Sequence, residues 1–199
     1  MRARDLMTAP VITVHPWTSA KEAAELLSMH GFTALPVVDD DDRLAGIVTE
    51  ADLIRGRLPA GPRSTREAVA GKTVGDLMSS PVIAMGTGTD VAELCQTLVQ
   101  ARIRAMPIVV RSAVVGIVTR GDLVRMLARD DLDIARDVKQ RLEIYGGSGR
   151  WNVDVRDGCA HITDEFDDDT DRHVARLLAL AVPGVVAADT AYAGEEQAR

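Results

Sequence analysis

The chain has 199 residues with a formal net charge of −7, and 46% of them are hydrophobic but only 3% aromatic. This length allows one or two domains, whose core must be built from Val, Leu, Ile, Ala and Met. The acidic balance argues against nucleic-acid binding, which depends on neutralising phosphates with basic residues. No apolar run suits a bilayer span or a signal peptide, so we expect a cytoplasmic protein.

The first expected elements are an opening segment, Asp5–Ile12, and an amphipathic helix from Ser19, where Ser19 and Glu22 have the spacing of a capping box. A strand over residues 34–38 precedes a run of four acids, Asp39–Asp42. Such a run can suggest a metal site, but nothing in it alternates with Gly as a calcium loop requires. We therefore predict a hairpin turn with solvated acids.

The stretch 46–52 reads Gly-Ile-Val-Thr-Glu-Ala-Asp and predicts the end of a buried strand that runs straight into a helix. It has two interpretations. In the first, Thr49 caps the helix and Asp52 completes a variant of the capping box. In the second, the same N–H groups and hydroxyl face a phosphate, and the carboxylate accepts hydrogen bonds from a ribose.

The whole pattern occurs twice. Residues 76–83 repeat the opening segment 71 residues later, and residues 116–122 repeat the Gly-Ile-Val-Thr stretch 70 residues later. A second helix is expected from Asp90 and a second strand over residues 105–109. The turn of the second copy is one residue shorter, which accounts for the change of offset. Residues 58–71, rich in Pro, Gly and Arg, are predicted to be a linker.

The sequence offers no catalytic constellation. Cys95 and Cys159 have no metal-ligand spacing and are interpreted as small buried residues. The four histidines fall in four different elements, and no nucleophile, zinc or phosphate-loop motif occurs. The stretch 86–89, Gly-Thr-Gly-Thr, predicts a turn because no Lys-Ser/Thr follows it. We therefore expect neither an enzyme nor a metal site.

The last third of the chain has a different pattern. Apolar residues at helical spacing predict a helix over residues 134–145, which the glycines of 146–149 end. Residues 151–155 alternate as a strand, Asp157-Gly158 predicts a tight turn, and residues 159–162 return. A helix with acids at its start follows over residues 167–180, and a short strand is expected from Pro183.

The duplicated pattern resembles the CBS domain, and two copies in tandem resemble a CBS pair, or Bateman module. The matching motifs are the Asp-Leu-Met-Thr/Ser-x-Pro-Val opening, the Leu/Met-Pro-Val/Ile strand and the Gly-Ile-Val-Thr-x-x-Asp close. The resemblance implies an α+β fold in which each repeat, 1–57 and 72–130, is strand-helix-strand-strand-helix. It also implies a homodimer built by the CBS pairs. Surplus apolar positions on the closing helices favour such an interface, namely Leu53, Ile54, Leu58, Leu123, Val124 and Leu127.

CBS pairs bind adenosine derivatives in two clefts between their halves, so the resemblance implies two nucleotide sites. Carried over to this chain, one cleft comprises Thr8, Ile12, Thr33, Ala34, Ile117, Thr119 and Asp122. The other comprises Ser79, Ile83, Arg104, Ala105, Ile47, Thr49 and Asp52. The isoleucines are expected to face adenine, the aspartates the ribose and the threonines the phosphate. Arg104 either pairs with phosphate or lies along the surface with its stem packed.

The tail, 134–193, resembles a BON domain of αββαβ order. The resemblance rests on the Val-x-Val-x-Asp-Gly hairpin, the helix carrying Arg172 and Arg176, and the Val-Pro-Gly-Val-Val turn. Where the family has a small Leu-Ser/Thr-Gly after the hairpin, this chain has Ile-Thr-Asp-Glu at 162–165. We expect the tail to fold separately, with a hinge near Asp130-Asp131.

Two functions follow from these resemblances. The first is a regulatory module that senses AMP, ADP, ATP, NAD or S-adenosylmethionine and uses the tail as an output or interaction element. The alternative is a membrane- or envelope-associated protein whose BON domain contacts phospholipid. The acids gathered in residues 164–171 count against the alternative.

Overall fold

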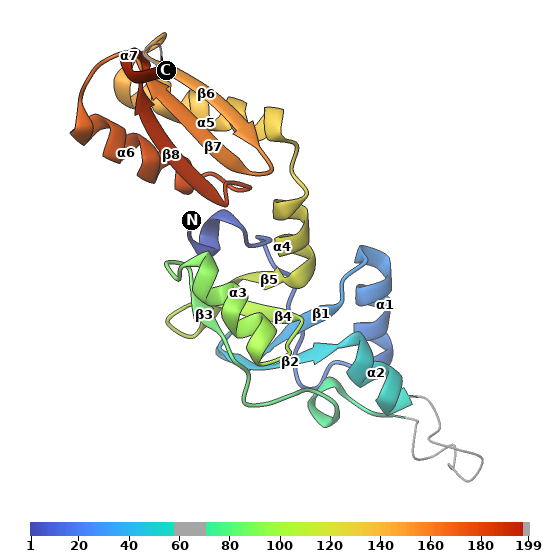
Figure 1. Ribbon diagram of the computed structural model, residues 1–199. Helices are drawn as coiled ribbons and strands as arrows, with labels where there is room; N and C mark the ends of the chain where they lie inside the picture. Colours follow the sequence, from blue (N-terminus) through green and yellow to red (C-terminus); the bar gives the residue numbers. More distant parts are fainter. Residues whose placement is uncertain (58–70, 197–199) are drawn as a thin grey trace. The chain divides into compact units, whose positions relative to one another are not determined.

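The computed structural model describes residues 1–57 and 71–196 (Figure 1). The predicted linker, apart from Gly71, lies outside the described residues. The chain divides into two compact units, which are taken in turn. The repeat unit comprises Met7–Arg120, and the tail unit comprises Met1–Leu6 together with Gly121–Arg199.

The repeat unit contains both copies of the duplicated pattern. The first copy consists of α1 (Ala20–His30), β1 (Ala34–Val38), β2 (Leu44–Thr49) and α2 (Glu50–Arg57). The second consists of η3 (Val74–Asp76), β3 (Met85–Gly86), α3 (Val91–Gln100), β4 (Ala105–Val110) and β5 (Ala113–Thr119), after which α4 (Arg120–Leu127) begins. In both copies an antiparallel hairpin runs into a helix, as the sequence predicts.

Local chemistry accounts for these elements. The hydroxyl of Ser19 accepts the N–H of Glu22 at 3.1 Å, and Gly31 ends α1 in the left-handed conformation. The hairpin predicted for the acidic run is confirmed: Asp39 accepts the backbone N–H groups of Asp41 and Arg43. The apolar residues of α1, β1, β2 and α2, together with Val14 and Val74, form one buried cluster: Val14, Ala20, Ala23, Leu27, Leu35, Val37, Val48, Leu53 and Val74.

The leading strand differs between the copies. In the second copy, β3 pairs with β4 in parallel, whereas the first copy has only an isolated bridge between Val14 and Val37. The next ladder bond would come from residue 16, but Pro16 has no N–H to donate. The ring Nδ1 of His15 instead lies 3.1 Å from the carbonyl oxygen of Val38. Proline therefore ends the strand that the sequence pattern predicts at this point.

The tail unit has the predicted order of helix, two strands, helix and strand. After η1 (Ala3–Asp5) and α4, its elements are α5 (Asp131–Gly146), β6 (Trp151–Arg156), β7 (Cys159–Asp164), α6 (Asp169–Leu180), β8 (Ala187–Tyr192) and α7 (Ala193–Glu196). The strand order is β6-β7-β8, with β6 antiparallel and β8 parallel to β7. Asp157 and Gly158 both have positive φ in the β6–β7 turn, which explains its Asp-Gly sequence.

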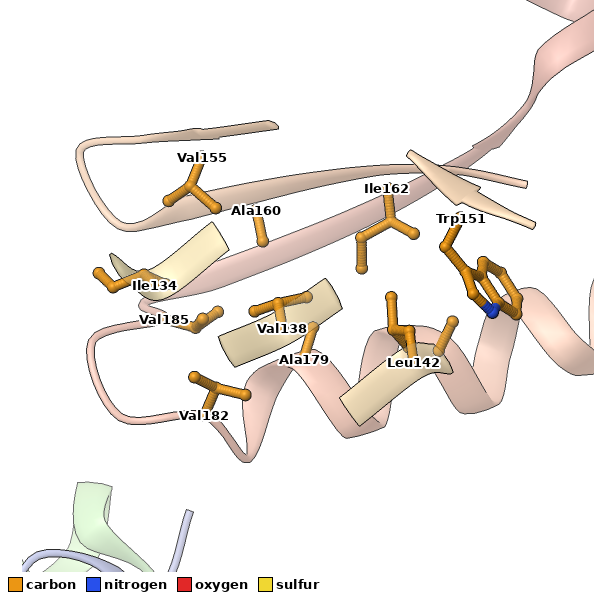
Figure 2. Packing of buried hydrophobic residues seen from close by; sticks show 11 residues of the cluster. Ile134, Val138, Leu142, Trp151, Val155, Ala160, Ile162, Ala179, Val182 and Val185 are labelled. Atoms are coloured by element: carbon orange, nitrogen blue, oxygen red, sulfur yellow. The ribbon is translucent and has the colours of Figure 1, made fainter. Parts of the chain in front are cut away.

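The core of the tail unit lies between α5, α6 and one face of the sheet (Figure 2). Ile134, Val138 and Leu142 point from α5 toward Trp151, Val155 and Ile162 on the strands. The last strand was predicted from Pro183 but begins at Ala187, because Gly184 turns the chain at a φ of +96°. Val185 is consequently the buried residue there, and Val186, which falls within the predicted strand, is 54% exposed.

Four polar side chains form a hydrogen-bonded network beside this core. Arg150 donates to both carboxylate oxygens of Asp164 at 2.7 Å, and a third bond reaches Asp171 at 2.6 Å. The hydroxyl of Tyr145 donates to the other oxygen of Asp171. The side chain of Asp164 is completely buried, so its charge requires this bidentate partner. The stretch 162–165, where the sequence departs from the BON pattern, thus supplies the buried carboxylate of an ion pair.

The residues near Asp130-Asp131, which were predicted to be a hinge, form hydrogen bonds within the tail unit. Asp130 caps α5 by accepting the N–H of Leu132, and Asp131 accepts those of Asp157 and Gly158 at 2.8 and 3.0 Å. Arg129 donates to the carbonyl oxygen of Pro183 at 2.6 Å. The packing of the tail therefore begins at least as early as Arg129.

Candidate functional site

The two copies exchange their opening segments within the repeat unit. Thr8 forms two backbone hydrogen bonds with Ile117 on β5 of the second copy, at 2.9 and 3.2 Å. Ser79 forms the corresponding pair with Ile47 on β2 of the first copy, at 2.9 and 3.1 Å. We call these the first junction (Thr8 and Ile117) and the second junction (Ser79 and Ile47). Each contains residues from both copies, an exchange that the resemblance to a CBS pair implies.

The centre between the junctions is apolar. Ala34, Ile47, Ala105 and Ile117 form one buried cluster, and Val11 and Val82 of the opening segments pack against it. In register, Ala34 lies opposite Thr49 and Ala105 lies opposite Thr119. The ends of both hairpins therefore lie together beside the two opening segments. Predicted residues of both sites consequently lie around this apolar cluster.

Thr49 and Asp52 form the reciprocal bonds of a capping box. The N–H and hydroxyl of Thr49 donate to Asp52 Oδ2 at 2.9 and 2.6 Å. The N–H of Asp52 donates to the Thr49 hydroxyl at 3.3 Å. The second carboxylate oxygen, Oδ1, accepts Arg55 at 2.7 Å. Asp52 is only 9% exposed, whereas the Arg55 side chain is 75% exposed, so the arginine is the partner that water or a ligand can displace.

The predicted aspartate of the first site lies in the first turn of α4. Asp122 is 6% exposed, and its Oδ1 accepts a short hydrogen bond from Arg125, the position that corresponds to Arg55. Thr119 ends β5. Both copies thus carry a nearly buried carboxylate at the third position of the helix with an exposed arginine three residues later.

Arg104 crosses from one copy to the other. Its guanidinium lies 3.5 Å from the carboxylate of Glu50, the first residue of α2, and its side chain is 73% exposed. Neither of the two interpretations offered for Arg104 included this partner. At the corresponding place in the first copy stands Thr33, whose carbonyl oxygen accepts the N–H of Glu50 at 3.1 Å.

Arg120, the counterpart of Glu50, turns back into its own copy. Its Nε and Nη2 donate to the carbonyl oxygens of Ile103 and Leu98 at 2.9 and 2.8 Å. Its backbone N–H donates to the carbonyl oxygen of Arg104 at 3.0 Å. The two copies therefore hold opposite charges at the first helical position, in different environments.

The expected adenine-facing isoleucines differ from one another. Ile12 is partly buried against the core of its own copy, and Ile83 is 47% exposed. Ile47 and Ile117 are buried between the copies at 8% exposure each. Thr8, Thr33 and Ser79 are exposed. The sequence interpretation missed the charged residues around these positions, Glu50, Arg55, Arg120 and Arg125, although helical spacing from each aspartate could have indicated the two later arginines.

The profile of the CBS domain matches the chain twice, at residues 3–58 and 74–129. The chain belongs to the CBS domain family. The two matched segments include all fourteen predicted site residues.

Relatives of this CBS pair are found among curated and solved proteins. Hypoxic response protein 1 of Mycobacterium tuberculosis is 31% identical over 127 residues, 63% of this chain and 84% of the relative. The CBSX2 structure in complex with AMP is 30% identical, with a TM-score of 0.55 over 62% of this chain and 94% of that one; CBSX2 is a protein of Arabidopsis thaliana.

A third relative is the CBS domain pair of protein MJ0100 in complex with 5′-methylthioadenosine and S-adenosyl-L-methionine. It is 30% identical, with a TM-score of 0.55 over 63% of this chain and 94% of that one. These likenesses concern the CBS pair. Within residues 1–57 and 71–196, the structure has no helix with the length and apolarity needed to cross a membrane. In the same ranges no three His, Cys, Asp or Glu side chains gather in a metal-binding arrangement.

Proposed function

We propose that the CBS pair is a regulatory module that binds adenosine-containing ligands at its two junctions. The reciprocal pairing of Thr8 with Ile117 and Ser79 with Ile47 carries this proposal. At the second junction this pairing brings Ser79 of one copy to the buried Ile47 of the other, on the strand that runs into the helix of the nearly buried Asp52. The complexes of CBSX2 with AMP and of the MJ0100 pair with methylthioadenosine and S-adenosylmethionine support it, because their ligands share adenosine.

The carboxylates suit the ribose. Asp52 Oδ2 already accepts two bonds from Thr49, but Oδ1 is bonded only to the exposed Arg55 in the hydrogen bonds described above. A ribose hydroxyl can donate a hydrogen bond to Oδ1 in place of Arg55 while the capping box stays intact. The capping and ribose-binding roles of Asp52 are therefore compatible, since they use different oxygens of the same carboxylate. The Thr49 hydroxyl, which was expected to face a phosphate, instead donates to Asp52.

Isothermal titration calorimetry tests this function. The full chain is titrated with AMP, ADP, ATP, NAD, S-adenosylmethionine and adenosine, with guanosine as a control for non-specific base binding. We expect saturable binding of the adenosine series and little of guanosine. An absence of binding by every adenosine compound would refute the function.

We also propose that residues 134–193 form a BON-like domain that serves as an output or interaction element. The αββαβ order and the parallel pairing of β7 with β8 support a separate small domain. Co-sedimentation with anionic and zwitterionic vesicles tests the phospholipid alternative. Sedimentation of the chain with vesicles would favour that alternative over an internal output element.

Finally, we propose that the CBS pairs associate as a homodimer. Leu53 and Leu123, which were counted as surplus, are buried in the chain, at 4% and 9% exposure. Ile54, Val124 and Leu127 are 55%, 62% and 63% exposed, and they support an interface on the closing helices. Leu58 lies outside the described residues.

A further inference from the structure

The two junctions carry different charges at matching positions. Glu50 begins α2 and Arg120 begins α4, and these residues stand 70 positions apart in the duplicated pattern. Arg104 and Thr33, 71 positions apart, stand at the ends of the loops that face them. Of the residues that differ between the copies at these places, Glu50 and Arg120 carry opposite charges, and Arg104 is charged where Thr33 is not, so their charges distinguish the two sites.

Glu50 adds a second acid to the N-terminal turn of α2, beside Asp52. The corresponding turn of α4 has one acid, Asp122, and the cation of Arg120. A helix N-terminus attracts an anion through its exposed N–H groups and its dipole. The first residue of α2 is thus an anion beside that favourable field, whereas the first residue of α4 is a cation held by backbone carbonyl oxygens.

The surroundings keep these charges in place. Arg120 is fixed by the carbonyl oxygens of Leu98 and Ile103. The matching positions in the first copy, Leu27 and Phe32, instead line an open pocket of about 390 Å³ together with Glu50. The carboxylate of Glu50 also lies 3.5 Å from the guanidinium of Arg104 of the other copy. The arginine that could have received a phosphate is thus paired with Glu50.

We propose that Glu50 makes the second junction selective for adenosine ligands without a phosphate group, whereas the first junction accepts phosphorylated ones. This inference rests on the proposed function. A phosphate near α2 would be the third negative group beside Glu50 and Asp52, and it would compete with Glu50 for Arg104. An uncharged 5′ substituent, or a cationic one such as a sulfonium, meets no such repulsion. Glu50 is therefore a specificity-determining residue.

Calorimetry with AMP and adenosine tests the proposal in the full-length chain. For the wild type we expect two adenosine sites per chain but only one AMP site of comparable affinity. Glu50→Gln removes the charge and keeps the shape, and it should strengthen AMP binding at the second site at least ten-fold, about 1.4 kcal/mol. Adenosine binding should change by less than about two-fold.

Glu22→Gln, at an exposed position in the first turn of α1, is the matched control and should leave both ligands unaffected. Asp52→Ala identifies the second site, because it should weaken one of the two adenosine sites. Equal AMP affinity at both wild-type sites, or an unchanged AMP isotherm in Glu50→Gln, would overturn this inference while adenosine binding upheld the proposed function. A chain that bound neither compound would overturn both.

Discussion

Met78 of the second opening segment lies directly on Gly46, the glycine that starts the Gly-Ile-Val-Thr stretch of the first copy. A Cβ atom at Gly46 would stand 2.7 Å from the Met78 sulfur and 2.9 Å from the carbonyl oxygen of Ser79. Met7 lies on Gly116 in the same way, with its sulfur 2.5 Å from a Cβ placed there. The glycines are thus required by the close approach of the other copy rather than by an unusual backbone conformation.

Gly46→Ala should therefore destabilise the repeat unit by about 1–3 kcal/mol, because the new methyl group meets backbone as well as a flexible side chain. Urea unfolding of the wild type and the variant measures the difference. Gly88→Ala is the control, since a Cβ there meets nothing within 4 Å. Equal stability of the two alanine variants would show that the junction yields to the methyl group.

Asp52→Ala and Asp122→Ala should each weaken one ligand site. Loss of a nearly buried charged acceptor is expected to cost about 1.5–3 kcal/mol, a ten- to hundred-fold loss of affinity. The measurement is calorimetry, with adenosine for Asp52→Ala and AMP for Asp122→Ala. Asp41→Ala, in the exposed β1–β2 turn, is the control. If both variants bind as the wild type does, the aspartates serve only as helix caps.

The tail unit should lose stability in acid through Asp164 and Asp171. Burial raises the pKa of Asp164, but the bonds from Arg150 and the Phe166 N–H outweigh it and leave the pKa below its ordinary value near 3.8. Bonds from Tyr145 and Arg150 lower the pKa of Asp171. Both contributions are complete above the ordinary value, where the unfolded chain is also ionised, and are lost as pH falls through the folded values.

Urea unfolding between pH 7 and pH 3 measures this effect, with the fluorescence of Trp151 as the probe in a Trp17→Phe background. Arg150→Leu should reverse the sign, because it leaves Asp164 buried without its partner. That variant should be about 3 kcal/mol less stable at pH 7 and regain stability on acidification. The same pH dependence in both proteins would contradict the assigned role of the ion pair.

The proposed homodimer should have twice the 21.4 kDa mass of the chain in light scattering at micromolar concentration. Ile54→Asp and Val124→Asp should shift it toward the monomer, because each places a charge on an exposed apolar helix position. Leu177→Asp, at a 53% exposed position on α6, should leave the mass unchanged. A wild-type particle of 21.4 kDa would rule the dimer out.

Removal of residues 132–199 should leave the ligand sites intact. A chain shortened after Asp131 keeps all predicted site residues, and we expect adenosine affinity within about threefold of the wild type, roughly 0.7 kcal/mol. Calorimetry on both chains measures this, and circular dichroism confirms folding of the shorter one. A larger loss in a folded protein would mean that the tail contributes to ligand binding.

The duplication made most of the fold predictable, because each hairpin and helix was indicated independently in two places. Where single residues decided the outcome, the pattern was less informative. Pro16 ends a strand that the second copy completes with β3, and Gly184 delays the start of β8. Each effect depends on a single residue, and the spacing of apolar residues does not reveal it.

The sequence placed the two aspartates at the helix starts, and the CBS resemblance implied the exchange between copies; ligand binding by these residues stays a prediction. The other charges of the site were not predictable. Glu50 and Arg120 fill variable positions of the same motif, and only the three-dimensional contacts separate them: one meets Arg104, the other backbone carbonyls. Asp164 likewise looked like a departure from the expected pattern at the end of β7. Its partner Arg150 lies just before β6, and the sequence pattern gave no sign that the two residues pair.

The exchanged opening segments mean that one copy of the repeat does not complete its own sheet. The edge of β2 receives Ser79 and the edge of β5 receives Thr8, each from the other copy. A shorter chain with a single repeat could meet the same requirement only by trading segments with a second molecule. In the tandem arrangement both segments are exchanged within one chain, so the pairing of the copies does not depend on protein concentration.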